Sequence, residues 1–267
     1  MRKSRLIALA ATMSAIPLVA AACGGGSSAT ATPAAPTIAP SAAATAPPSG
    51  TAAATTTAQT AKPKQYASAP PMTIDVNKQY FATLATNKGS VRIQLLPKSA
   101  PQTVNSFVFL ARDGYFNGVL FHRVVNGFMV QGGDPLTTDS SKSAVWGTGS
   151  PGYSLLDEFL CSDGKITNTL HPTCQLANTF DKAGVMAMAN TGQAHTGGSQ
   201  FFITLGAQTF LNGGYTIFGQ VASGQDVVQA IGAVSTQCSR TGQSESQGCS
   251  SRPDQPVVIN SVTIEEQ

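Results

Sequence analysis

The feature that most constrains this chain is a long segment, residues 24–71, built almost entirely from Ala, Thr, Pro, Ser and Gly. It holds eight of the chain's 16 prolines, and its only charged residues are Lys62 and Lys64. Its few large apolar side chains cannot offset the entropy lost on ordering, so we expect this segment to be disordered. Its prolines favour an extended backbone. The folded domain is therefore expected to occupy residues 72–267.

The N-terminus has the pattern of an export signal. Three basic residues lie within the first five positions, and an apolar run follows over residues 6–22. Small residues then lead to Cys23, as in a bacterial lipobox, although Ala20 stands where leucine is commoner. We predict a lipoprotein-type signal peptide over residues 1–22 and a tether over 23–71 that begins at a lipidated Cys23. The domain would then be lipid-anchored to the outer face of the membrane in the cell envelope. The alternative is an ordinary cleaved signal with an incidental cysteine.

Cysteines suggest an oxidising compartment. Apart from Cys23, the chain has four cysteines, and an even number of cysteines in an exported protein favours disulfides. Three connectivities are possible; pairing of sequence neighbours would close two short loops. The alternative is a zinc site, but no C-x-x-C occurs, and the nearest histidine is His171. We expect no metal and no cofactor. The four cysteines are Cys161, Cys174, Cys238 and Cys249.

Short alternating runs beyond residue 72 indicate a mainly β domain. Two such runs flank Asn87-Lys88-Gly89, which is typical of a hairpin. Helical spacing of apolar residues predicts one helix that starts near Ser99, a residue suited to capping, and stops before Gly114. A second helix is predicted over 223–234 and a last strand over 255–266. The polar regions that interrupt this rhythm are interpreted as surface insertions, near residues 137–146, 160–178 and 236–252.

Several function classes are excluded by composition and motif. Only 11% of residues are charged, the net charge is +3, and no run of Lys and Arg marks a nucleic-acid partner. The G-x-S-x-G pattern of many serine hydrolases is absent. Residues 147–152 match G-x-G-x-x-G, but Pro151 interrupts them and no helix follows, so dinucleotide binding is excluded.

One stretch, FHRVVNGFMVQGGDP at residues 121–135, sets an arginine beside large apolar residues. This combination suits rotation about a peptide bond to proline, whose barrier of roughly 18–20 kcal/mol comes from amide resonance. A catalyst needs an apolar pocket for the proline ring and a donor aimed at the prolyl nitrogen, whose lone pair is freed as the bond twists. Arg123, with Phe128 and Met129, supplies both.

Together with GVMAMANTG, GGSQFFITL and FLNGGYTIFGQV, this stretch resembles the cyclophilin family of peptidyl-prolyl cis-trans isomerases, in order and spacing, over about residues 79–264. The resemblance implies a closed eight-stranded antiparallel β-barrel capped by two α-helices. It implies an isomerase of X-Pro bonds that acts on proline-containing peptides and on unfolded or exported proteins, and so assists folding. The alternatives are a non-catalytic peptide-binding or holdase module on the same fold, or an unrelated barrel.

Site residues follow from the same resemblance. Arg123 corresponds to the catalytic arginine, and Gln131 to a glutamine that holds the arginine and the substrate backbone. The backbone of Ala189 and Asn190 would pair with an extended peptide, and Gln200 lies at the edge. His122 is close to the site, or is a buried structural residue. The proline pocket corresponds to Phe128, Met129, Phe202 and Leu211, with Phe210 and Tyr215 on its rim.

Two positions depart from the pattern of many eukaryotic members. Phe210 replaces a tryptophan and Tyr215 replaces a histidine. Without the indole N–H, one hydrogen-bond donor is lost, so we expect weak binding of the family's inhibitor cyclosporin. The segment between Asn190 and Gln200 is one residue longer than usual, so no role is carried over to His195. Trp146 lies in an insertion and is not the family's tryptophan.

Overall fold

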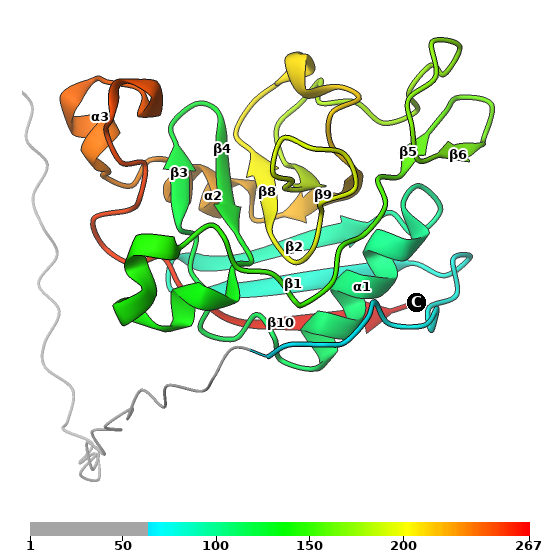
Figure 1. The fold of residues 1–267 in the computed structure, drawn as a ribbon, viewed down its shortest axis with the longest axis horizontal. Coiled ribbons are helices and arrows are strands. Elements are labelled where there is room, and N and C mark those ends of the chain that lie inside the picture. The colour runs from blue at the N-terminus through cyan, green and yellow to red at the C-terminus, as the bar shows by residue number, and fades with distance from the viewer. Residues whose placement is uncertain (1–63) are drawn as a thin grey trace, which may run out of the picture. The chain divides into compact units, whose positions relative to one another are not determined.

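The computed structural model describes residues 64–267. The predicted signal peptide, the lipidation site at Cys23 and the tether up to residue 63 lie outside the described residues. Within residues 64–267, eight antiparallel strands form one curled sheet in the order β10-β1-β2-β9-β7-β8-β4-β3 (Figure 1). The strands are β1 Tyr80–Thr86, β2 Gly89–Leu95, β3 Arg123–Val125, β4 Met129–Gly132, β7 Val185–Met188, β8 Phe201–Thr204, β9 Ile217–Ser223 and β10 Ile259–Glu266.

The expected closed barrel is met only in its coarser form, a mainly β fold with an eight-stranded sheet. The end strands β10 and β3 share no regular ladder within the described part of the chain. The segments before them meet instead, through a bridge between Leu120 and Val258. The outer edge of β3 is used otherwise, because the Val124 N–H donates to the Ser251 carbonyl at 2.8 Å. Residues 118–121 and 257–259 thus make the closing backbone hydrogen bonds, and the predicted insertion at residues 236–252 adds one bond to the outer edge of β3.

The predicted hairpin and both predicted helices are confirmed. Strands β1 and β2 turn at Asn87-Lys88-Gly89, and Gly89 has a φ of 129°, which a residue with a Cβ rarely adopts. Helix α1 spans Pro101–Arg112 and helix α2 spans Gln225–Gly232. Both helices bury apolar side chains in the same hydrophobic core as the sheet.

The cap of α1 differs from the expectation. The N-cap residue is Ala100, not Ser99, and its side chain makes no capping bond. Buried Glu158 instead accepts the N–H of Gln102 at 3.0 Å and the N–H of Thr103 at 2.9 Å. Burial raises the pKa of Glu158, and these hydrogen bonds act against that rise. A carboxylate from a distant loop suits the positive end of the helix dipole, which sequence-local capping rules cannot foresee.

An aromatic cluster forms the centre of the core. Phe107 of α1 stacks on Phe116 at a centroid distance of 5.0 Å and meets Phe201 of β8 edge-on at 5.8 Å. Phe121 and Phe218 complete the cluster around these rings. All five side chains are at most 2% exposed. Edge-to-face rings add specific geometry to simple burial, so the cluster fixes the position of β8 relative to α1.

The folded body begins earlier than the expected boundary at residue 72. The Tyr66 N–H donates to the Pro151 carbonyl at 2.8 Å, and its hydroxyl donates to Asp113 at 2.7 Å. The Tyr66 ring packs edge-on against Phe109 at 5.1 Å. Composition did not reveal this boundary, because the stretch is rich in Ala, Ser and Pro and only one aromatic residue, Tyr66, holds it against the domain.

All three predicted insertions are surface segments, and two carry disulfides. The first contains the 3₁₀ turns η1 Pro135–Thr138 and η2 Ser140–Val145. The second contains the hairpin of β5 Phe159–Leu160 and β6 Ile166–Thr167, and a Cys161–Cys174 disulfide. The third contains α3 Gln237–Thr241, the 3₁₀ turn η4 Glu245–Gln247 and a Cys238–Cys249 disulfide. Of the three connectivities, the local one is therefore present.

Two features are absent from residues 64–267. No helix there is long and apolar enough to cross a membrane. In the same residues, no group of three or more His, Cys, Asp or Glu side chains could hold a metal ion.

Candidate functional site

A pocket of about 100 Å³ opens at one face of the sheet, beside β3, β4 and β8. Of the twelve residues assigned to catalysis or substrate binding from sequence, nine line it. The three that do not are His122, Gln200 and Phe210. The nine are Arg123, Phe128, Met129, Gln131, Ala189, Asn190, Phe202, Leu211 and Tyr215.

Strand register sets the central part of this pocket. Arg123 of β3 pairs with Gln131 of β4, and Gln131 in turn pairs with Phe202 of β8. Directly opposed residues in an antiparallel sheet point to the same face. The arginine, the glutamine and the phenylalanine therefore form one row across three strands, on the face turned away from the aromatic core.

The floor of the pocket is apolar. Met129, Phe202 and Leu211 are at most 8% exposed and belong to a second, smaller hydrophobic cluster. The Tyr215 ring stands edge-on to Phe202 at 5.2 Å. Leu211 comes from the 3₁₀ turn η3, Thr209–Leu211. This floor offers a preformed apolar surface to a small ring, which is the usual design of a ligand pocket.

A chain of hydrogen bonds leads away from Arg123. Its Nη1 donates to Gln131 Oε1 at 3.3 Å, and Gln131 Nε2 donates to Gln200 Oε1 at 3.1 Å. Gln200 Nε2 donates to the carbonyls of Gly147 and Gly149, both at 2.9 Å. Gln200 thus lies outside the pocket and orients Gln131. The glycine-rich stretch that matched a nucleotide motif serves here as an acceptor for that amide.

The segment after β7 borders the pocket with its backbone. The Ala189 N–H is already bonded to the Gln200 carbonyl at 2.9 Å. The Asn190 side chain donates to the Gly214 carbonyl at 2.9 Å. The backbone N–H and C=O of Asn190 have no hydrogen-bond partner within the part of the chain that the structure describes. Asn190, rather than the Ala189 N–H, can therefore pair with an extended chain.

Neither His122 nor Phe210 contributes to the pocket wall. His122 is 7% exposed and lies below Gly147, and its Nδ1 has no partner among the described residues. Burial lowers the pKa of His122, and the nearby Asp134 opposes that shift. Phe210 is 74% exposed and packs on Phe128 at a centroid distance of 5.6 Å. Phe210 therefore forms an exposed rim.

One contact of Arg123 was missed by the sequence analysis. Glu245, from the third insertion, accepts from Arg123 Nε at 2.9 Å and from Nη2 at 2.6 Å. The two residues are 122 positions apart. Glu245 is a single acidic residue in a polar segment interpreted as a surface insertion, so no local signal in the sequence marks it.

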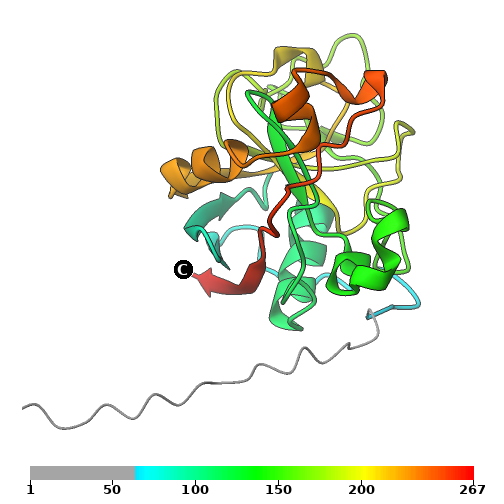
Figure 2. The ribbon, with the colours of Figure 1, turned by 90° about the vertical axis from the view of Figure 1, so that its left-hand side faces the viewer.

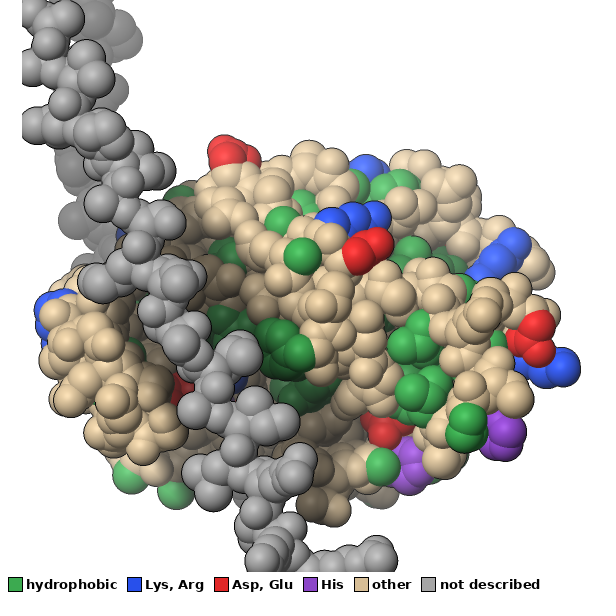
Figure 3. Space-filling model, turned by 90° about the horizontal axis from the view of Figure 1, so that it is seen from above, with side chains coloured by type: hydrophobic (Ala, Val, Ile, Leu, Met, Phe, Trp, Pro, Cys, Tyr) green, Lys and Arg blue, Asp and Glu red, His purple; other side chains and the backbone are tan. Residues whose placement is uncertain are grey.

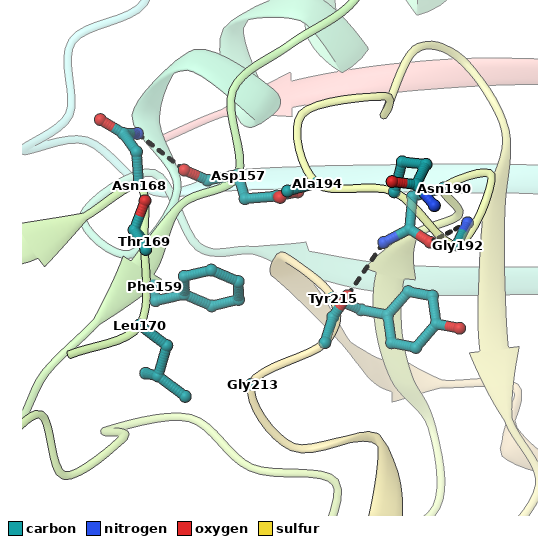
Figure 4. Close-up of a pocket in the computed structure, with 12 residues that line it drawn as sticks. Asp157, Phe159, Asn168, Thr169, Leu170, Asn190, Gly192, Ala194, Gly213 and Tyr215 are labelled. Carbon is teal, nitrogen blue, oxygen red and sulfur yellow. Dashed lines mark hydrogen bonds between the residues drawn. The ribbon is translucent and has the colours of Figure 1, made fainter. Parts of the chain in front are cut away.

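A larger hollow of about 370 Å³ lies beyond Asn190 and Tyr215, which line both cavities (Figure 4). Its far wall comes from the second insertion, where Asn168 Nδ2 donates to the Asp157 carbonyl at 2.7 Å.

Charged side chains are few and scattered on the face seen in Figure 3, with small groups of hydrophobic side chains between them. This face therefore creates no strong electrostatic field of one sign.

Comparison with known proteins gives one consistent family. Residues 81–264 match the family model described as "Cyclophilin type peptidyl-prolyl cis-trans isomerase/CLD". Peptidyl-prolyl cis-trans isomerase B of Streptomyces anulatus is 40% identical over 205 residues, which cover 70% of this chain and 98% of that protein. Peptidyl-prolyl cis-trans isomerase A of Mycobacterium tuberculosis is 40% identical over 200 residues, which cover 68% and 91%.

Solved structures agree with the sequence relatives. A crystal structure of a Cryptosporidium parvum cyclophilin-type peptidyl-prolyl cis-trans isomerase superposes with a TM-score of 0.56 at 26% identity, and covers 71% of this chain and 99% of that one. A second structure, of the same protein in the presence of the dipeptide Ala-Pro, gives a TM-score of 0.55 at 25% identity, and covers 70% and 99%.

The buried imidazole predicts a pH dependence of stability. Because the folded pKa of His122 lies below its unfolded value of about 6.5, the folded state binds fewer protons than the unfolded state. The stability that the neutral His122 contributes to the folded state is fully present above about pH 6.5. It is lost as the pH falls from there toward the lower pKa of the folded state. Urea unfolding at pH 7 and pH 5 should show a smaller loss for His122→Gln than for wild type. Exposed His171→Gln is the control, and equal losses in all three proteins would contradict the assignment.

Proposed function

The chain belongs to the cyclophilin-type peptidyl-prolyl cis-trans isomerase family, and on that premise we propose that it rotates X-Pro bonds at the pocket beside Arg123. The observation that carries the proposal is the position of Arg123. Its Nη1 edge points toward Gln131 and Met129, at the mouth of a pocket of about 100 Å³ whose floor is apolar. A fixed donor and an apolar seat are the two parts that rotation requires.

In the proposed mechanism no covalent bond forms. The proline ring rests on Met129, Phe202 and Leu211, and the preceding residue remains free to turn. As the amide twists, the prolyl nitrogen regains its lone pair and becomes an acceptor. Arg123 donates to that nitrogen, so it stabilises the twisted state more than either planar isomer. A guanidinium stays protonated throughout the neutral range.

Substrate backbone is held on both sides of this donor. Gln131 is fixed by Gln200 and keeps its place beside Arg123. The backbone N–H and C=O of Asn190, which have no partner within residues 64–267, offer a donor and an acceptor to an extended peptide. Pairing of this kind would hold a short extended stretch of the peptide along the backbone that follows β7. The substrates that fit are peptides and unfolded proteins with an exposed X-Pro bond.

Arg123→Ala tests the proposal. Loss of a preorganised donor should lower turnover of an Ala-Pro tetrapeptide by about 10²–10³-fold, measured by exchange NMR on the purified full chain. Arg92→Ala is a matched control, because Arg92 pairs with Glu265 at 2.7 Å away from the pocket. It should leave turnover unchanged.

The same measurement separates the enzyme from a holdase. Peptide binding by Arg123→Ala should be weakened much less than turnover, because the apolar floor is intact. If the wild type binds the peptide without accelerating exchange, the chain is a peptide-binding module and the proposal is wrong.

Weak cyclosporin binding is part of the proposal. Phe210, at the rim, has no N–H to donate where many eukaryotic members have an indole. A single added hydrogen bond of about 1.4 kcal/mol corresponds to a tenfold change in affinity. Phe210→Trp should therefore tighten cyclosporin binding about tenfold in calorimetric titration. A submicromolar Kd for the wild type would contradict this expectation.

We also propose that the chain is exported and lipid-anchored through Cys23, where it assists the folding of exported proteins. The basic N-terminus, the apolar run and the cysteine support this, and so do the two local disulfides, which suit an oxidising compartment. Cys23→Ala should move the protein from the membrane fraction to the soluble fraction and abolish labelling by a radioactive fatty acid. An unlabelled wild type would favour the ordinary cleaved signal.

A further inference from the structure

The third insertion, residues 236–252, lies against the strand that carries Arg123. Figures 1 and 2 both place α3 beside β3, and the bond from Val124 N to the Ser251 carbonyl joins the two segments. The Cys238–Cys249 disulfide closes the insertion across 11 residues, with its Cα atoms 5.1 Å apart. The insertion is therefore tied both to itself and to the sheet.

Contacts within the third insertion and with the first insertion hold it in place. Thr236 and Ser239 form a reciprocal capping box at the start of α3. Arg240 makes an ion pair with Asp254. Arg252 donates to the Ser143 carbonyl at 2.6 Å in the first insertion and lies over the Trp146 ring at 4.4 Å. The first and third insertions thus brace each other next to the pocket.

Glu245 reaches Arg123 from this support. Its carboxylate accepts from Nε at 2.9 and 3.0 Å and from Nη2 at 2.6 Å. Both side chains are about one-third exposed, at 35% and 38%. These hydrogen bonds from Arg123 lower the pKa of Glu245, so its carboxyl group is ionised at neutral pH.

Glu245 binds only one edge of the Arg123 guanidinium. Glu245 takes the Nε and Nη2 edge of the guanidinium, while Nη1 faces Gln131 and Met129. The carboxylate lines a neighbouring hollow of about 530 Å³ with Trp146, and it does not line the proline pocket. Glu245 therefore holds the arginine from behind and leaves the seat of the substrate free.

We propose that Glu245 is a positioning residue for the isomerase, presented by the disulfide-closed insertion so that the Nη1 edge of Arg123 stays aimed at the prolyl nitrogen. The role rests on the proposed function of Arg123. The third insertion would then take part in the reaction by holding the catalytic residue.

Two effects of the carboxylate oppose each other. It partly neutralises the guanidinium, which weakens a donor, and it removes the freedom of a long side chain, which improves the aim. The first effect is screened, because the pair is partly exposed and such pairs interact weakly. The second is large, because a misplacement of about 1 Å at a reacting centre can cost about 10²-fold in rate. Positioning therefore outweighs neutralisation.

Glu245→Ala and Glu245→Gln in the full chain test this role. We expect kcat to fall about tenfold in the alanine variant and KM to stay within about twofold, because the lost aim matters only in the twisted state. The glutamine variant, which keeps one acceptor, should lie between. Glu265→Ala removes a carboxylate from the comparable pair with Arg92 and should change neither constant. The Arg123 Nε–H signal in NMR should exchange faster with solvent in both Glu245 variants.

The outcomes separate this role from the proposed function. If the wild type has no turnover, or if Arg123→Ala keeps full turnover, the proposed function is wrong and this role with it. If the wild type is active, Arg123→Ala is inactive and Glu245→Ala is unchanged, only the positioning role is wrong. A faster Glu245→Ala would show that the carboxylate restrains the arginine, which also overturns the proposal.

The disulfide provides a second, independent arm. A Cys238→Ser, Cys249→Ser double variant frees the segment that carries Glu245, so it should lower kcat as Glu245→Ala does. The two changes combined should cost no more than either alone, because they remove one contact. The Cys161→Ser, Cys174→Ser variant is the matched control and should keep the wild-type kcat. Additive losses would overturn the link between the disulfide and the arginine.

Discussion

The alternation of side chains between the two faces of each strand governs both the core and the site. Successive side chains of a strand point to opposite faces. In β8, Phe201 enters the aromatic cluster with Phe107, while Phe202 forms the pocket floor. In β4, Val130 is in the core and Gln131 faces the arginine. A register slip of one residue would exchange the two faces. Core packing therefore also fixes the strand residues of the pocket, Arg123, Met129, Gln131 and Phe202.

A row of side chains becomes a catalyst only when its polar members are held. Arg123 lies between two supports, Gln131 on the pocket side and Glu245 on the insertion side. Gln131 depends in turn on Gln200 and on glycine carbonyls of the loop before Pro151. Each bond contributes little to stability at a partly exposed site. Their value lies in geometry, because electrostatic catalysis depends on donors placed in advance.

Two of the segments predicted as insertions carry disulfides and line cavities beside the sheet. The second carries one disulfide and lines the larger hollow beyond Asn190. The third carries the other disulfide, covers the edge of β3 and contacts the arginine. A short segment without a core of its own cannot stay in one conformation at a surface, and a disulfide limits the alternatives. The Cys238–Cys249 disulfide thus limits the conformations of the segment that places Glu245 beside Arg123.

Local sequence signals were enough to predict the main elements and most of the residues that line the pocket. Alternation and turn chemistry predicted the Asn87–Gly89 hairpin, and helical spacing predicted both helices. Of the twelve residues carried over from the family motifs, nine line one cavity. These signals are local or repeated along the chain. Other features became visible only in the folded structure. They are the capping of α1 by Glu158, the packing of Tyr66 against the domain and the contact of Glu245 with Arg123. The disulfide pairing and the incomplete closure at β3 belong to the same group. Each joins residues that no periodicity relates, such as two charges 122 positions apart, and only the folded backbone brings them within hydrogen-bonding distance.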